Sequence, residues 1–381
     1  MEVLWAGEIE QRIDGDRVVM LRKERVRLPP EHPGAPALAL VRKHALGGPH
    51  RPPVLLVHGF AQNRYSWHTS QRSMSAWLAA EGFDVWNLEL RGHGRSRHDG
   101  QQGAEQFADY VADVLHAAAS LPARAFWIGH SLGGAAIYGA AAVRPAASLG
   151  VVGIGGLYGF AQHNWLIRRL CRTTRRLAEA PGGTLLQNLQ IKTRMGGGFL
   201  ARLYSVSDVA GYAIPLSGWW PGSIEPDLLE ERLTRGFDWT SVTVWMEMSR
   251  WGAGAPFDYD PQWQVADMPL LVLLGDQDHL LMPGDGRLAY DRSASSDKTL
   301  TILDDYHHEV HWGHLDLILG RRAPGVVWPM IGDWMAARAA SAPAPAPMSP
   351  ADRAALPRPT QRQRRRETLR GLLGWAADEL G

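Results

Sequence analysis

The stretch that decides the fold reads AFWIGHSLGGAAIYGAAA, residues 125–142. Its apolar start at 125–128 predicts a buried strand, and the Ala-rich run at 132–142 predicts a helix. Between them lies Gly-x-Ser-x-Gly at 129–133, which would place Ser131 on a sharp strand-to-helix turn. The flanking glycines let strand and helix approach closely because neither carries a Cβ. We predict Ser131 as a nucleophile; the structural alternative is a serine that only caps the helix.

A catalytic serine needs a base to take its proton and an acid to orient that base. Residues 270–274, LLVLL, form an apolar run typical of a parallel strand buried on both faces. The run ends in Gly-Asp-Gln-Asp at 275–278, and sites in open α/β sheets form just beyond such strand ends. Asp278 lies deeper in the loop and is the predicted acid. Asp276 is predicted to be a turn residue that bonds local backbone N–H groups.

The base is expected in residues 306–316, YHHEVHWGHLD, which contain four histidines and follow an apolar strand predicted at 299–303. His314 is the predicted base, because it follows a glycine and opens the helical pattern at 315–319. The other three are expected to be solvated loop residues, with a chance metal site as the alternative: His307, His308 and His311. They show no recognised metal-site spacing, so no metal is expected.

The negative charge of a tetrahedral intermediate needs preorganised hydrogen-bond donors. Residues 53–57, PVLLV, predict a buried strand that ends in His58-Gly59-Phe60. The loop after this strand and the residue after the nucleophile supply the two donors in a known arrangement. The backbone N–H groups of Phe60 and Leu132 are therefore the predicted oxyanion hole. A plain strand-end turn is the alternative for residues 58–59.

Five segments together resemble the α/β-hydrolase superfamily of esterases and lipases. They are residues 57–60, 91–96, 129–133, 274–278 and 313–316. The resemblance implies an α/β fold: a doubly wound, mostly parallel sheet with an inserted helical cap. It also implies that Ser131, Asp278 and His314 form the catalytic triad.

Three stretches resemble the acid-lipase branch of this superfamily, the gastric and lysosomal lipase group. They are residues 77–97, 244–260 and 313–316, the last with the catalytic histidine before Leu-Asp. The chain departs from that branch at two positions. Leu132 follows the nucleophile where the branch usually carries Gln, and Glu89 stands where it usually carries Asp. The resemblance thus implies a hydrolase without specifying triacylglycerol as substrate.

Composition limits the classes of partner. The chain has 381 residues, 45% of them hydrophobic, and a formal net charge of +1, which favours a globular protein without a nucleic-acid partner. No apolar run reaches the roughly 20 residues that span a bilayer. The one cysteine, Cys171, cannot form an internal disulfide, and no signal segment opens the sequence. These features predict a cytoplasmic location.

The landmarks divide the chain into four predicted regions. They are residues 1–155, the first part of the hydrolase core; 156–265, a helical Trp-rich cap; 266–340, the second part of the core; and 341–381, a linker and tail. Residues 17–28 and 37–44 are expected to form an antiparallel sheet edge. Strands are then predicted at 53–57, 84–88, 125–128 and 149–154, with helices at 71–81, 106–120 and 132–142.

Tryptophans gather in the predicted cap, at positions 165, 219, 220, 239, 245, 251 and 263. The cap as a whole is expected to form an apolar roof over the serine, whereas any single tryptophan is expected to hold the cap together. The basic residues at 168–176, with Lys192 and Arg194, are expected to form a solvated helix face. A membrane-surface role is the alternative.

The tail has a different composition from the rest. Alternating Pro and Ala at 342–347 predict a stiff, extended linker. Arginines at 362–366 then precede leucines at helical spacing up to Leu380. This pattern predicts a short amphipathic helix that could contact an anionic membrane or dock on the body of the protein. A mostly disordered tail is the alternative.

The expected function is hydrolysis of a carboxylic ester with an apolar acyl chain, through an acyl-enzyme and without a cofactor. The partner is a small-molecule ester or a lipid. Acyltransferase, thioesterase and polyester depolymerase activities use the same triad and remain alternatives. A non-catalytic binding protein would normally lack a triad member. Haloalkane dehalogenase and epoxide hydrolase chemistry need a carboxylate nucleophile, and position 131 is serine.

Overall fold

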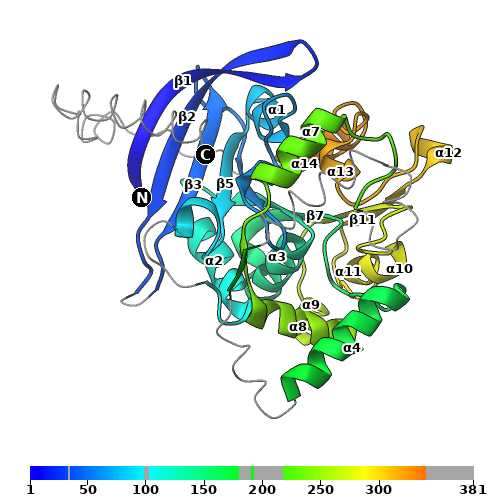
Figure 1. Ribbon diagram of the computed structural model, residues 1–381. Helices are drawn as coiled ribbons and strands as arrows, with labels where there is room; N and C mark the ends of the chain where they lie inside the picture. Colours follow the sequence, from blue (N-terminus) through cyan, green and yellow to red (C-terminus); the bar gives the residue numbers. More distant parts are fainter. Residues whose placement is uncertain (33–34, 98–102, 180–189, 193–217, 340–381) are drawn as a thin grey trace.

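A nine-stranded sheet organises the computed structural model, which describes residues 1–32, 35–97, 103–179, 190–192 and 218–339 (Figure 1). The strand order is β1-β2-β3-β5-β4-β6-β7-β10-β11. These strands are β1 (Glu2–Asp14), β2 (Arg17–Leu28), β3 (Leu38–Ala45), β4 (Pro53–Val57), β5 (Asp84–Glu89), β6 (Ala125–His130), β7 (Ser148–Ile154), β10 (Leu270–Gly275) and β11 (Lys298–Leu303). A two-stranded sheet pairs β8 (Gln190–Lys192) with β9 (Trp239–Ser241).

Strands β5, β4, β6, β7, β10 and β11 run parallel, and β1, β2 and β3 form an antiparallel extension. Every residue of β4, β6 and β10 is buried, because helices cover both faces of the sheet. The predicted fold class is therefore confirmed.

Two apolar cores lie on opposite faces of the sheet. One face carries α2 (Phe107–Ala119), α3 (Leu132–Val143), α8 (Val242–Gly252) and α9 (Asp260–Trp263). The other face carries α1 (Met74–Ala80), α7 (Pro226–Arg235), α13 (Asp316–Leu319) and α14 (Val327–Ala339). The remaining helices are α4 (Trp165–Glu179), α10 (Pro283–Gly286), α11 (Leu288–Asp291) and α12 (Asp305–His308), with 3-10 turns at 64–66, 94–97 and 145–147.

The strand β1 is a feature that the sequence patterns did not reveal. It pairs with β2 in a long hairpin at one edge of the sheet (Figure 1). Most of its side chains are exposed or half-buried, and only Gln11 and Ile13 are buried. A strand with so few buried side chains gives a weak hydrophobic alternation, since one face packs on the core only near its end.

The segment between β7 and β10 contains α4, α7, α8 and α9; α4, α8 and α9 lie together at the bottom of Figure 1, whereas α7 lies apart from them and packs on the other face of the sheet. Trp251 and Trp263 are buried in the core, as expected for tryptophans that hold this part together. Trp165 differs, with 66% of its surface exposed. The division into core, cap and tail stays a prediction, and residues 193–217 and 340–381, with Arg194 and the tail, lie outside the described residues.

Among the described residues, no helix is long and apolar enough to cross a bilayer.

Candidate active site

Ser131 occupies the tight turn between β6 and α3. Its backbone has φ 57° and ψ −123°, a strained conformation for a residue with a Cβ. A Cβ at Gly129 would lie 2.3 Å from the Gly133 carbonyl oxygen, and one at Gly133 would lie 2.3 Å from the Val57 carbonyl oxygen. The side chain of Ser131 makes no capping hydrogen bond to the described part of α3. The turn therefore presents the hydroxyl instead of using it as a helix cap.

Asp278 and His314 are in direct contact. His314 Nδ1 lies 2.6 Å from Asp278 Oδ2, and both side chains are almost completely buried. The other carboxylate oxygen accepts the backbone N–H groups of Leu280 at 2.9 Å and Leu281 at 2.7 Å. These bonds fix the carboxylate, and a carboxylate at Nδ1 favours the tautomer whose Nε2 is free to accept a proton.

His314 lies against the residues that surround the elbow, the strand-to-helix turn between β6 and α3 that carries Ser131. Its ring centroid is 4.4 Å from that of His130, and His130 Nε2 lies 3.1 Å from the His314 carbonyl oxygen. A Cβ on Gly155 would lie 3.1 Å from His314 Nδ1, and the preceding carbonyl, of Ile154, accepts the Ser131 N–H at 3.2 Å. No hydrogen bond joins Ser131 Oγ to His314 within the described residues. The structure thus pairs Asp278 with His314 and sets the pair beside the turn that carries Ser131.

The predicted oxyanion amides belong to two segments that touch. A Cβ on Gly59 would lie 2.9 Å from Ser131 Cβ, so the loop after β4 passes directly by the elbow. Neither the Phe60 nor the Leu132 N–H has a hydrogen-bond partner among the described residues, which leaves both available to an acceptor.

His58 fixes the start of that loop. Its Nδ1 donates to the Gly59 carbonyl at 2.9 Å, and its Nε2 accepts the Leu90 N–H at 3.1 Å. Burial lowers the pKa of His58 to about 3, so the ring stays neutral at every ordinary pH. His58 is therefore part of the scaffold rather than a titrating catalytic group.

A second His–Asp pair corrects two predictions. Asp276 bonds the side-chain amide of Gln277 at 3.3 Å instead of backbone N–H groups of its own turn, while its Oδ2 lies 2.6 Å from His311 Nδ1 and its Oδ1 accepts the Trp312 N–H at 2.9 Å. His311 is thus not a free solvated side chain, because the loop after β11 folds back over the loop after β10. The ligand atoms of Asp276, Asp305 and His311 lie within 4.8 Å of one another, a grouping that the sequence spacing did not reveal.

Asp316 is a buried acid that the sequence reasoning did not assign. Its carboxylate accepts the N–H of Trp220 at 2.7 Å, the N–H of Gly313 and the hydroxyl of Ser223. Burial raises the pKa of Asp316 to about 7. Its place after His-Leu in the resembled motif at 313–316 could have indicated its importance. Asp316 holds the loop that carries His314.

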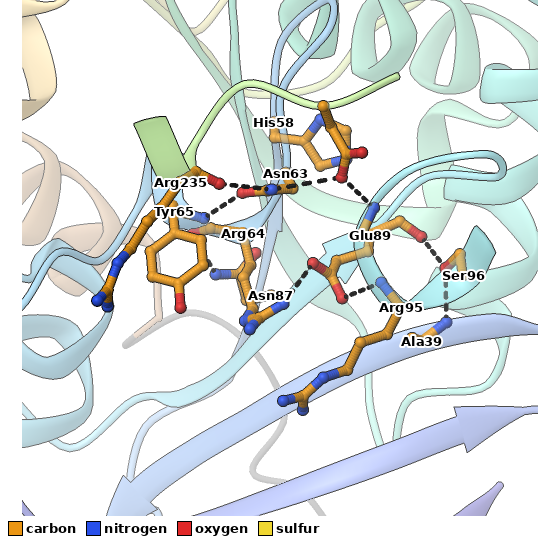
Figure 2. Close-up of polar contacts among 12 residues, drawn as sticks. Ala39, His58, Asn63, Arg64, Tyr65, Asn87, Glu89, Arg95, Ser96 and Arg235 are labelled. Carbon is orange, nitrogen blue, oxygen red and sulfur yellow. Dashed lines mark hydrogen bonds and ion pairs between the residues drawn. The ribbon is translucent and has the colours of Figure 1, made fainter. Parts of the chain in front are cut away.

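Glu89, where the chain departs from the resembled branch, is fully buried next to the loop that follows β4 (Figure 2). It accepts hydrogen bonds from Arg64 Nη1 and from the N–H of Arg95, each at 3.0 Å. Its backbone carbonyl accepts the Ser96 hydroxyl, which in turn accepts the Ala39 N–H. The acidic residue at position 89 therefore joins β5 to the turn at 91–97.

Comparison with known proteins identifies the class. A family model described as the alpha/beta hydrolase fold matches residues 52–318, and the chain belongs to this family. Monoacylglycerol lipase of Mycolicibacterium smegmatis is 27% identical over 266 residues, which cover 68% of this chain and 81% of the lipase. The crystal structure of Paleococcus ferrophilus monoacylglycerol lipase aligns with a TM-score of 0.55 at 18% identity, over 79% of this chain and 99% of that one.

A shorter match concerns Epoxide hydrolase B of Mycobacterium tuberculosis. The two chains are 36% identical over 104 residues, which cover 27% of this chain and only 28% of the epoxide hydrolase. So short a stretch carries no information about the activity of the whole protein.

Proposed function

We propose that this protein is a serine hydrolase that cleaves carboxylic esters with an apolar acyl chain. The observation that carries the proposal is the conjunction of two features at one end of the sheet. Ser131 stands on a strained strand-to-helix turn, and the buried His314–Asp278 pair, joined at 2.6 Å, lies beside that turn. Nucleophile, base and orienting acid are the three parts that acyl transfer through a serine requires.

The proposed reaction proceeds in two halves. His314 Nε2 takes the proton of Ser131 Oγ as that oxygen attacks the ester carbonyl, and the N–H groups of Phe60 and Leu132 bind the resulting oxyanion. His314 then passes the proton to the alkoxide as the carbon–oxygen bond breaks, which releases the alcohol and leaves an acyl-Ser131. A water, deprotonated by the same imidazole, attacks the acyl-enzyme; the bond between the acyl carbon and Ser131 Oγ then breaks, the imidazolium returns its proton to Oγ, and the carboxylic acid leaves.

Aromatic side chains near Phe60, in the loop after β4, favour a substrate with an apolar acyl group. The ring of Trp245, on α8, lies 6.1 Å from that of Phe60 and 6.5 Å from that of Phe160. These rings belong to the core on the α2–α3 face of the sheet, so α8 contributes an aromatic ring next to Phe60. The monoacylglycerol lipase relative agrees with an ester that carries a single acyl chain.

The residue at the turn, Ser131, also bears on epoxide hydrolysis, acyl transfer and thioester hydrolysis. Epoxide hydrolysis requires a carboxylate nucleophile, and the residue on the turn is Ser131. An acyltransferase or a thioesterase would use the same triad and differ in the acceptor or the leaving group. Adding a competing alcohol during turnover distinguishes acyl transfer from hydrolysis, because an acyltransferase forms the new ester in preference to the free acid.

The test combines labelling with a substrate series. A fluorophosphonate probe is expected to modify Ser131, and a series of p-nitrophenyl esters from short to long is expected to show turnover that depends on acyl length. Ser131→Ala should lower kcat by about 10⁴-fold or more while leaving the fold intact, because triad members act as a unit. Probe labelling that persists in Ser131→Ala, or ester turnover that survives it, would disprove the assignment.

A further inference from the structure

The oxyanion loop, residues 60–66, is bonded to a segment far along the chain, the C-terminal end of α7 and the residues after it. The Asp238 N–H donates to the Ala61 carbonyl at 2.8 Å, and Gln62 pairs with Phe237 in an isolated β-bridge. The side-chain amide of Asn63 donates to the Arg235 carbonyl at 2.9 Å (Figure 2). The inserted region therefore holds the loop from which the Phe60 amide emerges.

Asp238 joins three segments through its carboxylate. Its Oδ2 accepts the N–H of Gly94 at 2.6 Å and the amide of Asn63 at 3.3 Å, and its Oδ1 accepts Arg97 Nη1 at 2.9 Å. Only 8% of Asp238 is exposed, so these bonds form away from bulk solvent. Hydrogen bonds to an ionised group in such surroundings are among the stronger ones in proteins.

Arg232 makes a second bridge from α7 to the same loop. Its Nη2 lies 3.3 Å from Ser66 Oγ, which donates to Gln62 Oε1 at 2.8 Å. That oxygen lies 3.2 Å from the position a Cβ on Gly59 would take, beside the elbow. Arg232 is 1% exposed, and its Nε and Nη1 have no hydrogen-bond partner among the described residues. Burial lowers its pKa to about 10, which leaves it charged at neutral pH.

A buried cation without a carboxylate partner destabilises a fold unless it serves another interaction. The position of Arg232 suggests which one. Burial lowers the pKa of both His58 and His130, at the ends of β4 and β6, and the Arg232 guanidinium adds a smaller contribution to each. A positive potential there favours the negative charge that develops when Ser131 attacks a carbonyl.

The oxyanion loop also needs outside support for its own geometry. Ala61 has φ 56°, in the left-handed region that residues with a Cβ rarely adopt. Phe60 precedes it directly, so the strained residue constrains the chain immediately after the Phe60 amide. Strained backbone persists only where surrounding contacts hold it.

We infer that Asp238 and Arg232 are positioning residues for the oxyanion hole, which couple the inserted segment to catalysis. The inference rests on the proposed function. Asp238 holds the strained loop through its backbone N–H at Ala61 and its carboxylate at Asn63, and Arg232 holds it through Ser66 and Gln62. Oxyanion donors accelerate acyl transfer because they are already in place when charge develops. The inserted segment is thus part of the catalytic apparatus and not only a cover.

The experiment compares Asp238→Ala and Arg232→Met with a control, Glu230→Gln. Glu230 is exposed on α7, the helix that also carries Arg232. Concentrations are normalised to sites titrated with a fluorophosphonate. Each test variant is expected to lower kcat on a p-nitrophenyl ester by about 10- to 100-fold, less than the loss of a donor itself. KM should change by less than about threefold, because ground-state binding is untouched. Affinity for an alkylboronic acid, which forms a tetrahedral anion on serine, should fall in parallel with kcat.

A merely structural role predicts a different pattern: fewer titratable sites and a lower melting temperature, with unchanged kcat per titrated site and unchanged boronate affinity. That pattern would overturn the inference. If Asp238→Ala fails to fold, Asn63→Ala removes the bonds of the loop to Asp238 and to the Arg235 carbonyl, Ser66→Ala removes its contact with Arg232, and both are read in the same way. Absent ester turnover or absent Ser131 labelling in the unmodified protein would instead contradict the proposed function.

Discussion

Two His–Asp pairs have the same Nδ1–Oδ2 distance, and burial distinguishes them. His314–Asp278 and His311–Asp276 are each joined at 2.6 Å. The side chains of the first pair are 3% and 0% exposed, and those of the second are 28% and 17% exposed. An imidazole that carries charge in a transition state gains more from a carboxylate shielded from water. The buried pair is therefore the one suited to catalysis.

Substitution separates the two pairs. His314→Ala and Asp278→Asn are each expected to lower kcat by about 10⁴-fold, because each removes a member of the proposed triad. His311→Ala and Asp276→Asn should keep most of the activity, since they affect only the outer pair. Steady-state kinetics with a soluble p-nitrophenyl ester measures all four. If an outer-pair variant is inactive while its inner counterpart retains activity, the triad assignment is wrong.

Asp316 gives a prediction for stability against pH. Burial raises its pKa to about 7, whereas in the unfolded chain it ionises near its ordinary value of about 4. Between these values the folded protein holds one more proton than the unfolded chain, so this residue makes the free energy of unfolding fall as pH rises from about 4 to 7. Above pH 7 its contribution is constant.

Urea unfolding of the unmodified protein and of Asp316→Asn at pH 5, 6, 7 and 8 measures this effect. The difference between their free energies of unfolding should depend on pH up to about 7 and then level off. The variant is also expected to be less stable overall, because an amide cannot accept all three hydrogen bonds of the carboxylate. A difference that is flat between pH 5 and 7 would show that the carboxylate is ionised throughout this range.

The sequence indicated individual catalytic residues because their chemistry is local. Ser131 stands in a recognisable strand-turn-helix pattern, and Asp278 and His314 follow strands that the apolar runs locate. The partner of Asp276 was not predicted, because no motif marks His311 and only the folding of the loop after β11 brings it to Asp276. Arg232 and Asp238 carry no motif at all, and their importance comes only from the contacts that tertiary structure creates.

At the scale of elements, the buried strands were predicted well, and the ends of the helices were predicted less well. The helix expected at 71–81 spans Met74–Ala80, because Ser73 caps it by accepting the Ala76 N–H. The helix expected at 106–120 spans Phe107–Ala119, with Gln106 at its start. The missed strand β1 is stabilised mainly by pairing with β2, and backbone pairing leaves little trace in a hydrophobic pattern.

The strand-to-helix turn gives an element-scale prediction. Gly133→Ala places a Cβ 2.3 Å from the Val57 carbonyl oxygen, so α3 must move away from β4. We expect a loss of about 1–3 kcal/mol in the free energy of unfolding, typical of overpacking, together with a loss of esterase activity as Ser131 shifts. Urea unfolding and ester hydrolysis measure the two effects.

Gly47→Ala is the matched control for this substitution. A Cβ on Gly47 would meet nothing within 4 Å, so its effect on the free energy of unfolding should stay within about 0.5 kcal/mol. If both variants were equally stable, the close approach at the turn would not be a constraint on the sequence.

At the scale of the whole molecule, strand order explains why four distant loops meet. Strand β6 lies between β4 and β7, and β10 lies on the far side of β7. Because these strands are parallel, their carboxyl ends share one edge of the sheet. This edge carries Phe60 after β4, Ser131 after β6 and Asp278 after β10, while the loop after β11 brings His314 back to Asp278. Such an arrangement follows from alternating strands and helices, which is why the sequence could predict it.

The last prediction concerns the tail, whose residues lie outside the described part of the chain. The described core ends with α14, whose Trp328, Ile331 and Met335 are fully buried and complete one face of the sheet. The Pro-Ala linker that follows predicts that residues beyond it are independent of this core. Truncation after Ser341 should therefore leave the melting temperature and the hydrolysis of soluble short esters unchanged.

Vesicle binding tests the other half of this prediction. If the basic amphipathic segment ending near Leu380 contacts lipid, the truncated protein should bind anionic vesicles more weakly than the full chain. Added salt should weaken binding of the full chain in the same way, because exposed charges are screened within about 10 Å at 0.1 M salt. Equal vesicle binding by the two proteins would exclude a lipid-contacting tail. A large fall in melting temperature on truncation would show instead that the tail docks on the core, where its leucines would be buried against the protein and withheld from the membrane.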